Sequence, residues 1–127
     1  MEAAFSVGRI IVGLYFLSNA YNHVIKGSHM VGYAASKGVP SPKLAITGSG
    51  LLLLAGALSI LSGIAVFWGI VALIAFMVPV TFKMHAYWKE TDPMAKMSAR
   101  IEFQKNMAIT GFLLMALAIP TPWVYSL

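Results

Sequence analysis

The 127-residue sequence contains no cysteine. This absence excludes disulfides, iron–sulfur clusters, thiolate chemistry and cysteine-based zinc sites. Charge is also scarce, because only 10% of the residues are charged, against roughly 25% in soluble domains. Since 59% of the residues are hydrophobic, the composition excludes an ordinary water-soluble domain. We expect one membrane domain that covers residues 1–127.

Four apolar stretches fill the chain, at about 5–25, 44–61, 64–82 and 103–125. Each is close to the roughly 20 residues that a helix needs to cross the hydrocarbon core of a bilayer. The sequence therefore predicts an all-α integral membrane protein, a four-helix bundle with four crossings. The connection at 26–43 mixes Gly, Pro and aromatic residues, which favours a folded segment with a short helix over 30–36 that ends at Gly38.

The basic residues predict an orientation. Eight of the nine lie in the connections 26–43 and 83–105, which four crossings place on one face of the membrane. By the positive-inside rule both connections are cytoplasmic, and both termini lie outside the cell membrane. We expect the ninth, Arg9, to reach outer lipid phosphates. The net charge of +5 then reflects contact with anionic headgroups, and no nucleic-acid partner is expected.

Two local patterns predict further detail. Asp92 followed by Pro93 is typical of a helix start, with Asp as the cap and Pro in the first position. Small residues recur through the second stretch and allow another helix to approach closely, either inside the bundle or from a partner. These small residues are Gly48, Ala55, Gly56, Ser59 and Gly63.

Polar side chains inside a membrane are costly and usually face the bundle interior or a cavity. Asn19 and His23 share one face of the first stretch, one turn apart. His85 and Trp88 follow the third stretch, and Asn106 lies in the first turns of the fourth. All five lie at similar depth near the cytoplasmic face, so we predict that they converge on one polar pocket beneath the first connection.

That pocket has two interpretations. In the first, it is a hydrogen-bonded network that fixes helix register, and Glu102 and Lys105 neutralise each other. In the second, the two imidazoles bind a quinone carbonyl, a haem iron or a copper ion. The candidate cofactor-binding residues are His23, His85, Asn19, Trp88 and Asn106. No catalytic residue is assigned, and the identity of any metal stays unknown.

Four segments resemble the DoxX-like family of small membrane proteins, and the resemblance covers essentially the whole chain. They are residues 8–17 (GRIIVGLYFL), 33–42 (YAASKGVPSP), 85–88 (HAYW) and 103–106 (FQKN). The resemblance implies a compact four-helix membrane bundle and a link to terminal quinol oxidase and thiosulfate:quinone oxidoreductase systems. It also implies that recurring polar or aromatic positions of the family fall on Arg9, His85, Trp88, Lys105 and Asn106.

One departure from the family pattern matters. Many relatives carry a glutamate before a Gly-Gly pair in the second crossing, whereas residues 51–56 here read LLLLAG. Any proton or quinone role of that glutamate is therefore lost.

Two functional hypotheses follow. The first is a small accessory subunit, without catalytic turnover or a cofactor of its own, that contacts the lipid bilayer and other subunits of a membrane oxidase, monooxygenase or quinone-linked enzyme, or a second copy of itself. The second is a redox subunit that binds quinone, haem or copper near His23 and His85. A small-molecule or ion carrier is a weaker third hypothesis, since four short crossings leave little room for a path.

Overall fold

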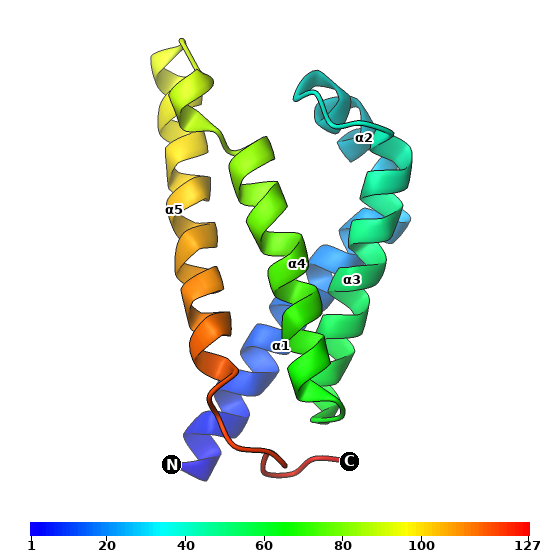
Figure 1. Ribbon diagram of the computed structural model, residues 1–127, viewed down its shortest axis with the longest axis vertical. Coiled ribbons are helices and arrows are strands. Elements are labelled where there is room, and N and C mark those ends of the chain that lie inside the picture. Colours follow the sequence, from blue (N-terminus) through cyan, green and yellow to red (C-terminus); the bar gives the residue numbers. More distant parts are fainter.

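The computed structural model describes all 127 residues, and its secondary structure is entirely helical. This confirms the prediction of an all-α protein. Four long helices and two short ones follow one another along the chain (Figure 1). Their bounds are α1 Glu2–Ile25, α2 Gly27–Ser36, α3 Pro42–Ser62, α4 Val66–Met84, the 3-10 turn η1 Tyr87–Lys89, and α5 Pro93–Ala116.

Three of the helices are long and apolar enough to cross a membrane: α1, α3, and α4 together with its continuation to Lys89. Only 17% of the apolar window of α1 is buried inside the molecule, so most of its side chains face outward, where lipid contacts them. Helix α5 has 24 residues as well, but three charged side chains interrupt its first half and Lys105 follows directly. The length and apolar composition of the three helices identify a membrane protein.

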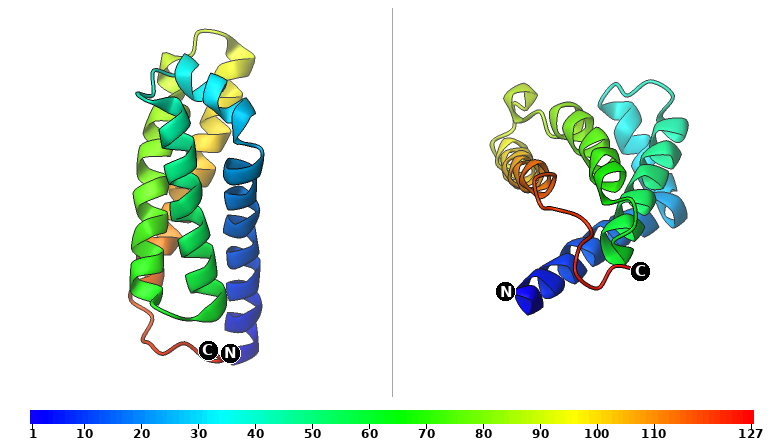
Figure 2. Two further views of the ribbon diagram at one scale, coloured as in Figure 1. Left: turned by 90° about the vertical axis from the view of Figure 1, so that its right-hand side faces the viewer. Right: turned by 60° about the horizontal axis from the view of Figure 1, so that its bottom comes forward.

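The helices pack in chain order, α1 on α3, α3 on α4 and α4 on α5. Figure 1 shows α3 and α4 close together near their shared turn and far apart at their other ends. Both termini lie near that shared turn (Figures 1 and 2). We call this the closed end. The opposite end, which carries α2, η1 and the start of α5, is the open end.

Glycine lets α3 and α4 touch at the closed end. A Cβ atom on Gly56 of α3 would overlap the side chain of Leu73 on α4, and one on Gly69 of α4 would overlap Ser59. The two backbones therefore approach more closely than larger residues permit. This confirms that Gly56 and Ser59 serve packing inside the bundle, whereas a Cβ on Gly48 would meet nothing within 4 Å.

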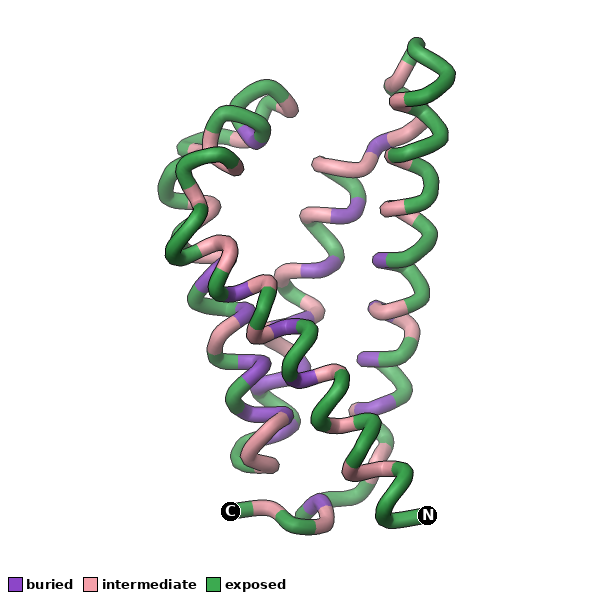
Figure 3. The backbone as a smooth tube through the Cα atoms, turned by 180° about the vertical axis from the view of Figure 1, so that it is seen from behind, coloured by how far each residue is buried: buried purple, intermediate pink, exposed green.

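The apolar core lies mainly in this half of the molecule, where most buried positions gather in Figure 3. It joins all four long helices into one cluster. Its fully buried large members include Phe16, Leu53, Ile70, Leu73, Met77 and Leu113.

The last helix differs from the predicted stretch at both ends. It begins at Pro93, about ten residues before 103, because Asp92 caps it: the Asp92 carboxylate accepts a hydrogen bond from the N–H of Ala95 at 2.9 Å. This confirms the predicted helix start. The helix ends at Ala116, so the prediction of a helix up to 125 is wrong. Pro120 and Pro122 lack the N–H that a helix requires, and residues 117–127 form an irregular tail.

Arg9 holds that tail against the closed end. Its guanidinium donates to the carbonyls of Val124 (2.6 Å), Tyr125 (3.1 Å) and Leu61 (3.2 Å). The N–H of Leu127 donates to the carbonyl of Ser62 at 2.9 Å. Arg9 was expected to reach lipid phosphates, but backbone carbonyls at the ends of α3 and of the chain accept hydrogen bonds from three of its five donors instead.

The first connection contains α2, which starts at Gly27 rather than at 30 and lies across the open end (Figure 2). Gly38 follows it with φ of +76°, a left-handed conformation that glycine adopts without strain. Pro42 then takes the first position of α3. Helix α2 packs on α3 and more lightly on α1, so α2 belongs to the α1–α3 side of the molecule.

Candidate functional site

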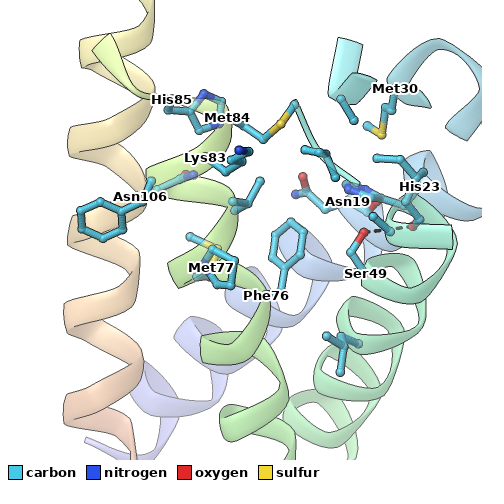
Figure 4. A pocket seen from close by; sticks show the side chains of 18 of the residues that line it. Asn19, His23, Met30, Ser49, Phe76, Met77, Lys83, Met84, His85 and Asn106 are labelled. Carbon is cyan, nitrogen blue, oxygen red and sulfur yellow. Dashed lines mark hydrogen bonds between the residues drawn. The ribbon is translucent and has the colours of Figure 1, made fainter. Parts of the chain in front are cut away.

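A cavity of about 780 Å³ lies at the open end, between the α1–α3 side and the α4–α5 side (Figure 4). Its volume falls in the range of about 300–1,000 Å³ that is typical of small-molecule sites. Most of the lining is apolar, with Phe76 and Met77 of α4 among it. The polar lining comes from every long helix and includes Asn19, His23, Ser49, Lys83, His85 and Asn106.

The α1 wall of the cavity presents hydrogen-bond acceptors. The Asn19 amide nitrogen donates to the carbonyl of Tyr15 at 2.8 Å, which leaves its side-chain oxygen available. His23 Nδ1 lies 2.9 Å from the carbonyl of Asn19. Because a carbonyl only accepts, Nδ1 carries the hydrogen, and in the neutral ring Nε2 holds the free lone pair. The His23 and Phe76 rings pack in a T-shaped arrangement, with 5.5 Å between the ring centroids.

Asn106 supplies an unused polar group on the opposite wall. The residue is only 6% exposed, and its amide makes no hydrogen bond within the protein, although its backbone carbonyl accepts from the Thr110 hydroxyl at 2.8 Å. Figure 4 shows the amide directed into the cavity. Neither amide atom is fully enclosed by the protein, so the side chain is open to the cavity and can bind a polar group placed there.

Lys83 lies at the mouth of the same cavity. Its ammonium nitrogen is 3.6 Å from the point that a Cβ on Gly38 would occupy, so the side chain reaches from α4 to the connection after α2. Sequence reasoning missed this role and treated Lys83 only as one cation of a basic connection. Phe76, Val80 and Lys83 are spaced four and then three residues apart, which places all three on one face of α4. This spacing was the pattern in the sequence that could have predicted the position of Lys83 in the cavity.

The structure gathers four of the five predicted binding residues in one cavity, namely Asn19, His23, His85 and Asn106. Figure 4 shows His23 and His85 on opposite sides. Trp88 does not line the cavity. It is 48% exposed and packs beside the α4–α5 connection in a cluster with Phe82, Tyr87 and Phe103. No three His, Asp or Glu side chains come together in an arrangement that could hold a metal ion.

Comparison with protein families gives a match to the DoxX family model over residues 4–86. The chain belongs to the DoxX family. The match covers α1 to α4 and reaches His85, while Trp88 and Asn106 lie beyond it. Comparisons with curated proteins and with solved structures gave no match. Family membership identifies a membrane protein and associates it with oxidoreductase-related function.

An ion pair bridges the two sides of this DoxX-family protein above the cavity. The Lys37 ammonium, just after α2, lies 2.5 Å from the carboxylate of Glu90, just after η1. Both line a second cavity of about 480 Å³, which shares Tyr33, His85 and Glu102 with the first. The hydrogen bond to Glu90 raises the pKa of Lys37 above its usual value. The cation therefore stays charged at neutral pH, and the bridge persists there.

Proposed function

We propose that this DoxX-family protein is a small accessory subunit of a larger membrane oxidoreductase complex, such as an oxidase, a monooxygenase or a quinone-linked enzyme. In this role it has no catalytic turnover of its own. The observation that carries the proposal is the open packing of the long helices: α5 packs on α4 and η1 but has little backbone contact with α1 or α3. The outer faces of α1 and α5 are thus available to lipid, to other subunits or to a second copy.

Large apolar side chains cover these outer faces. Val7, Ile11 and Leu14 of α1 are more than half exposed, as are Leu114 and Met115 of α5. Lipid chains can pack against such an apolar surface, and so can a transmembrane helix of a partner. The family association with oxidoreductase-related function favours a partner of that class.

The proposal includes four crossings with both termini outside. With 24 residues, α5 is roughly 36 Å long, which is enough to cross the hydrocarbon core alongside α4. Its charged first turns then project among headgroups at the open end. Because the connections 26–43 and 83–105 carry the cations and lie at that end, the positive-inside rule assigns the open end to the cytoplasm.

Purification from the native membrane in a mild detergent, followed by mass spectrometry of co-purifying chains, tests this function. A stoichiometric set of oxidoreductase subunits is expected. The variant Leu114→Trp changes the outer face of α5 and should reduce their recovery, whereas Leu58→Trp on the exposed face of α3 should not. Wild-type protein that purifies without any partner chain, and whose unfolding temperature shows that it is still folded, would contradict the accessory role.

The cavity favours a second candidate, a redox subunit that binds quinone, haem or copper. Of these, the lining fits a quinone best, since Lys83 and Asn106 offer donors to a carbonyl oxygen and His23 Nε2 offers an acceptor. A bound quinone–quinol couple would supply electron transfer, and His23 would accept at Nε2 the proton that a quinol hydroxyl releases as the quinol passes its electrons to the larger complex. For haem or copper the cavity provides the imidazoles of His23 and His85 without a third His, Asp or Glu beside them.

An optical spectrum, with metal and quinone analysis of the isolated chain, separates the two candidates. A cofactor that the wild type retains, and that His23→Ala or His85→Ala loses, would replace the accessory role by a redox role. A colourless, metal-free and quinone-free chain that still recovers its partner subunits supports the accessory role.

A further inference from the structure

The cavity carries one uncompensated positive charge. Only four acidic residues occur in the chain, and none of them pairs with Lys83. Each has another place: Glu90 pairs with Lys37, Glu102 pairs with Lys105 at 2.6 Å, Asp92 caps α5, and Glu2 lies in the first turn of α1 at the closed end. The protein therefore has no carboxylate left to neutralise the Lys83 ammonium.

Two hydrogen-bond donors line this side of the cavity. Lys83 extends into the mouth near Gly38, and the Asn106 amide, which makes no hydrogen bond within the chain and is open to the cavity, lies on the wall formed by α4 and α5 (Figure 4). An ammonium and an amide N–H₂ together suit an oxygen-bearing anion, because charge-assisted hydrogen bonds are the stronger kind. Lys83 is exposed at the mouth of the cavity, so its ammonium is accessible to the head group of a ligand that enters there.

The remainder of the lining suits a hydrocarbon chain. Below the polar groups the cavity is bounded by apolar side chains of α3 and α4, among them Leu52, Ala75, Phe76 and Met77. We infer that the cavity binds an amphiphile with an anionic head and an alkyl chain. The head lies on Lys83 and Asn106, and the chain lies along α3 and α4. This inference goes beyond the accessory role and does not depend on it.

A free long-chain carboxylate and an anionic phospholipid share this chemistry. The absence of cysteine provides a clean reporter, because Ser49→Cys places the only thiol of the protein on the cavity wall. The experiment measures the rate at which N-ethylmaleimide labels this thiol in phosphatidylcholine nanodiscs, with palmitate added as the anionic probe and hexadecanol as its uncharged counterpart.

Palmitate should slow labelling, and hexadecanol should do so far less. Lys83→Gln should weaken the palmitate effect by roughly tenfold or more, since a hydrogen bond to a charged group is lost, and Lys83→Arg should restore most of it. Lys89→Gln removes a cation at the same end outside the cavity, and it should change nothing. Unfolding temperatures of all variants separate a lost site from a lost fold.

Equal protection by palmitate and hexadecanol would overturn the inference, as would a Lys83→Gln protein that folds and is still protected by palmitate. A third result would also overturn the inference and favour the quinone. In that case decylubiquinone protects the thiol equally in wild type and in Lys83→Gln, and palmitate does not protect it. Replacing part of the phosphatidylcholine by phosphatidylglycerol identifies the source. Protection by this lipid alone upholds the anionic amphiphile and assigns it to the bilayer, whereas protection by palmitate alone assigns a free carboxylate.

Discussion

The closed end and the open end use the same long helices in different ways. At the closed end, α3 and α4 meet at Gly56 and Gly69, the large buried side chains form one core, and Arg9 fastens the tail. At the open end, the helices diverge around a cavity whose polar lining includes an amide without a partner in the chain. The difference indicates that the closed end supplies stability, while the open end is free to bind a ligand.

The strongest test of this contrast changes the glycine contact at the closed end. Gly56→Val should lower the free energy of unfolding by about 3 kcal/mol, the upper part of the usual cost of overpacking, because the new side chain overlaps Leu73. Gly48→Val adds the same atoms to the same helix where space is open. Thermal unfolding in detergent should therefore separate the two variants clearly, and equal midpoints would contradict the assignment.

Removing the Arg9 contacts should have the next largest effect. Arg9→Gln loses hydrogen bonds to three carbonyls and should cost about 2 kcal/mol, a typical value for bonds to charged groups. Arg9→Lys should fall between wild type and Arg9→Gln, because an ammonium lacks the planar fork of a guanidinium. Hydrogen exchange over residues 117–127 should rise in both variants, and an unchanged rate would show that Arg9 does not hold the tail.

The bridge at the open end should matter less. A double-mutant cycle with Lys37→Gln and Glu90→Gln should give a coupling energy below about 1 kcal/mol, as for most ion pairs near the surface. Since the folded-state pKa of Lys37 is raised above 10.5, the contribution is complete below the unfolded value and disappears as pH rises through the folded value. Unfolding midpoints of wild type and Lys37→Gln should therefore differ equally from pH 7 to 9 and converge above pH 10.5. A difference in midpoint that becomes smaller between pH 7 and 9 would be inconsistent with an ion pair between Lys37 and Glu90.

The smallest effect is expected at Trp88. Because the side chain is half exposed and outside the cavity lining, Trp88→Phe should shift stability by less than about 1 kcal/mol. The labelling rate of the thiol in Ser49→Cys should not change. A clear change in that labelling rate would show that Trp88 contributes to the cavity.

The sequence predicted what local pattern controls. Apolar stretches of membrane length located α1, α3 and α4, Asp92 with Pro93 located the start of α5, and the spacing of Asn19 and His23 placed them on one face. Contacts between distant segments carry no such pattern. The three carbonyls bound by Arg9 lie 52, 115 and 116 residues away, so composition alone suggested lipid phosphate instead.

The cavity was predictable only in part, for the same reason. Asn19, His23, His85 and Asn106 stood out as rare polar residues in apolar helices. Lys83 resembled the other cations of a basic connection, and its place in the cavity depends on the position of Gly38, 45 residues earlier in the sequence. Trp88 stands three residues after His85, but the chain leaves α4 at Met84 and turns through η1, which carries the indole away from the cavity.

The most direct test of the contrast between the two ends is the unfolding temperature of the delipidated Asn106→Leu protein. If the open end serves binding, the change removes an amide that makes no hydrogen bond in the chain and only faces the cavity, so the midpoint should be equal to that of wild type or higher. A fall that corresponds to more than about 1 kcal/mol would contradict the account. It would show that the Asn106 amide stabilises the fold, and that the cavity wall belongs to the stabilising part of the molecule.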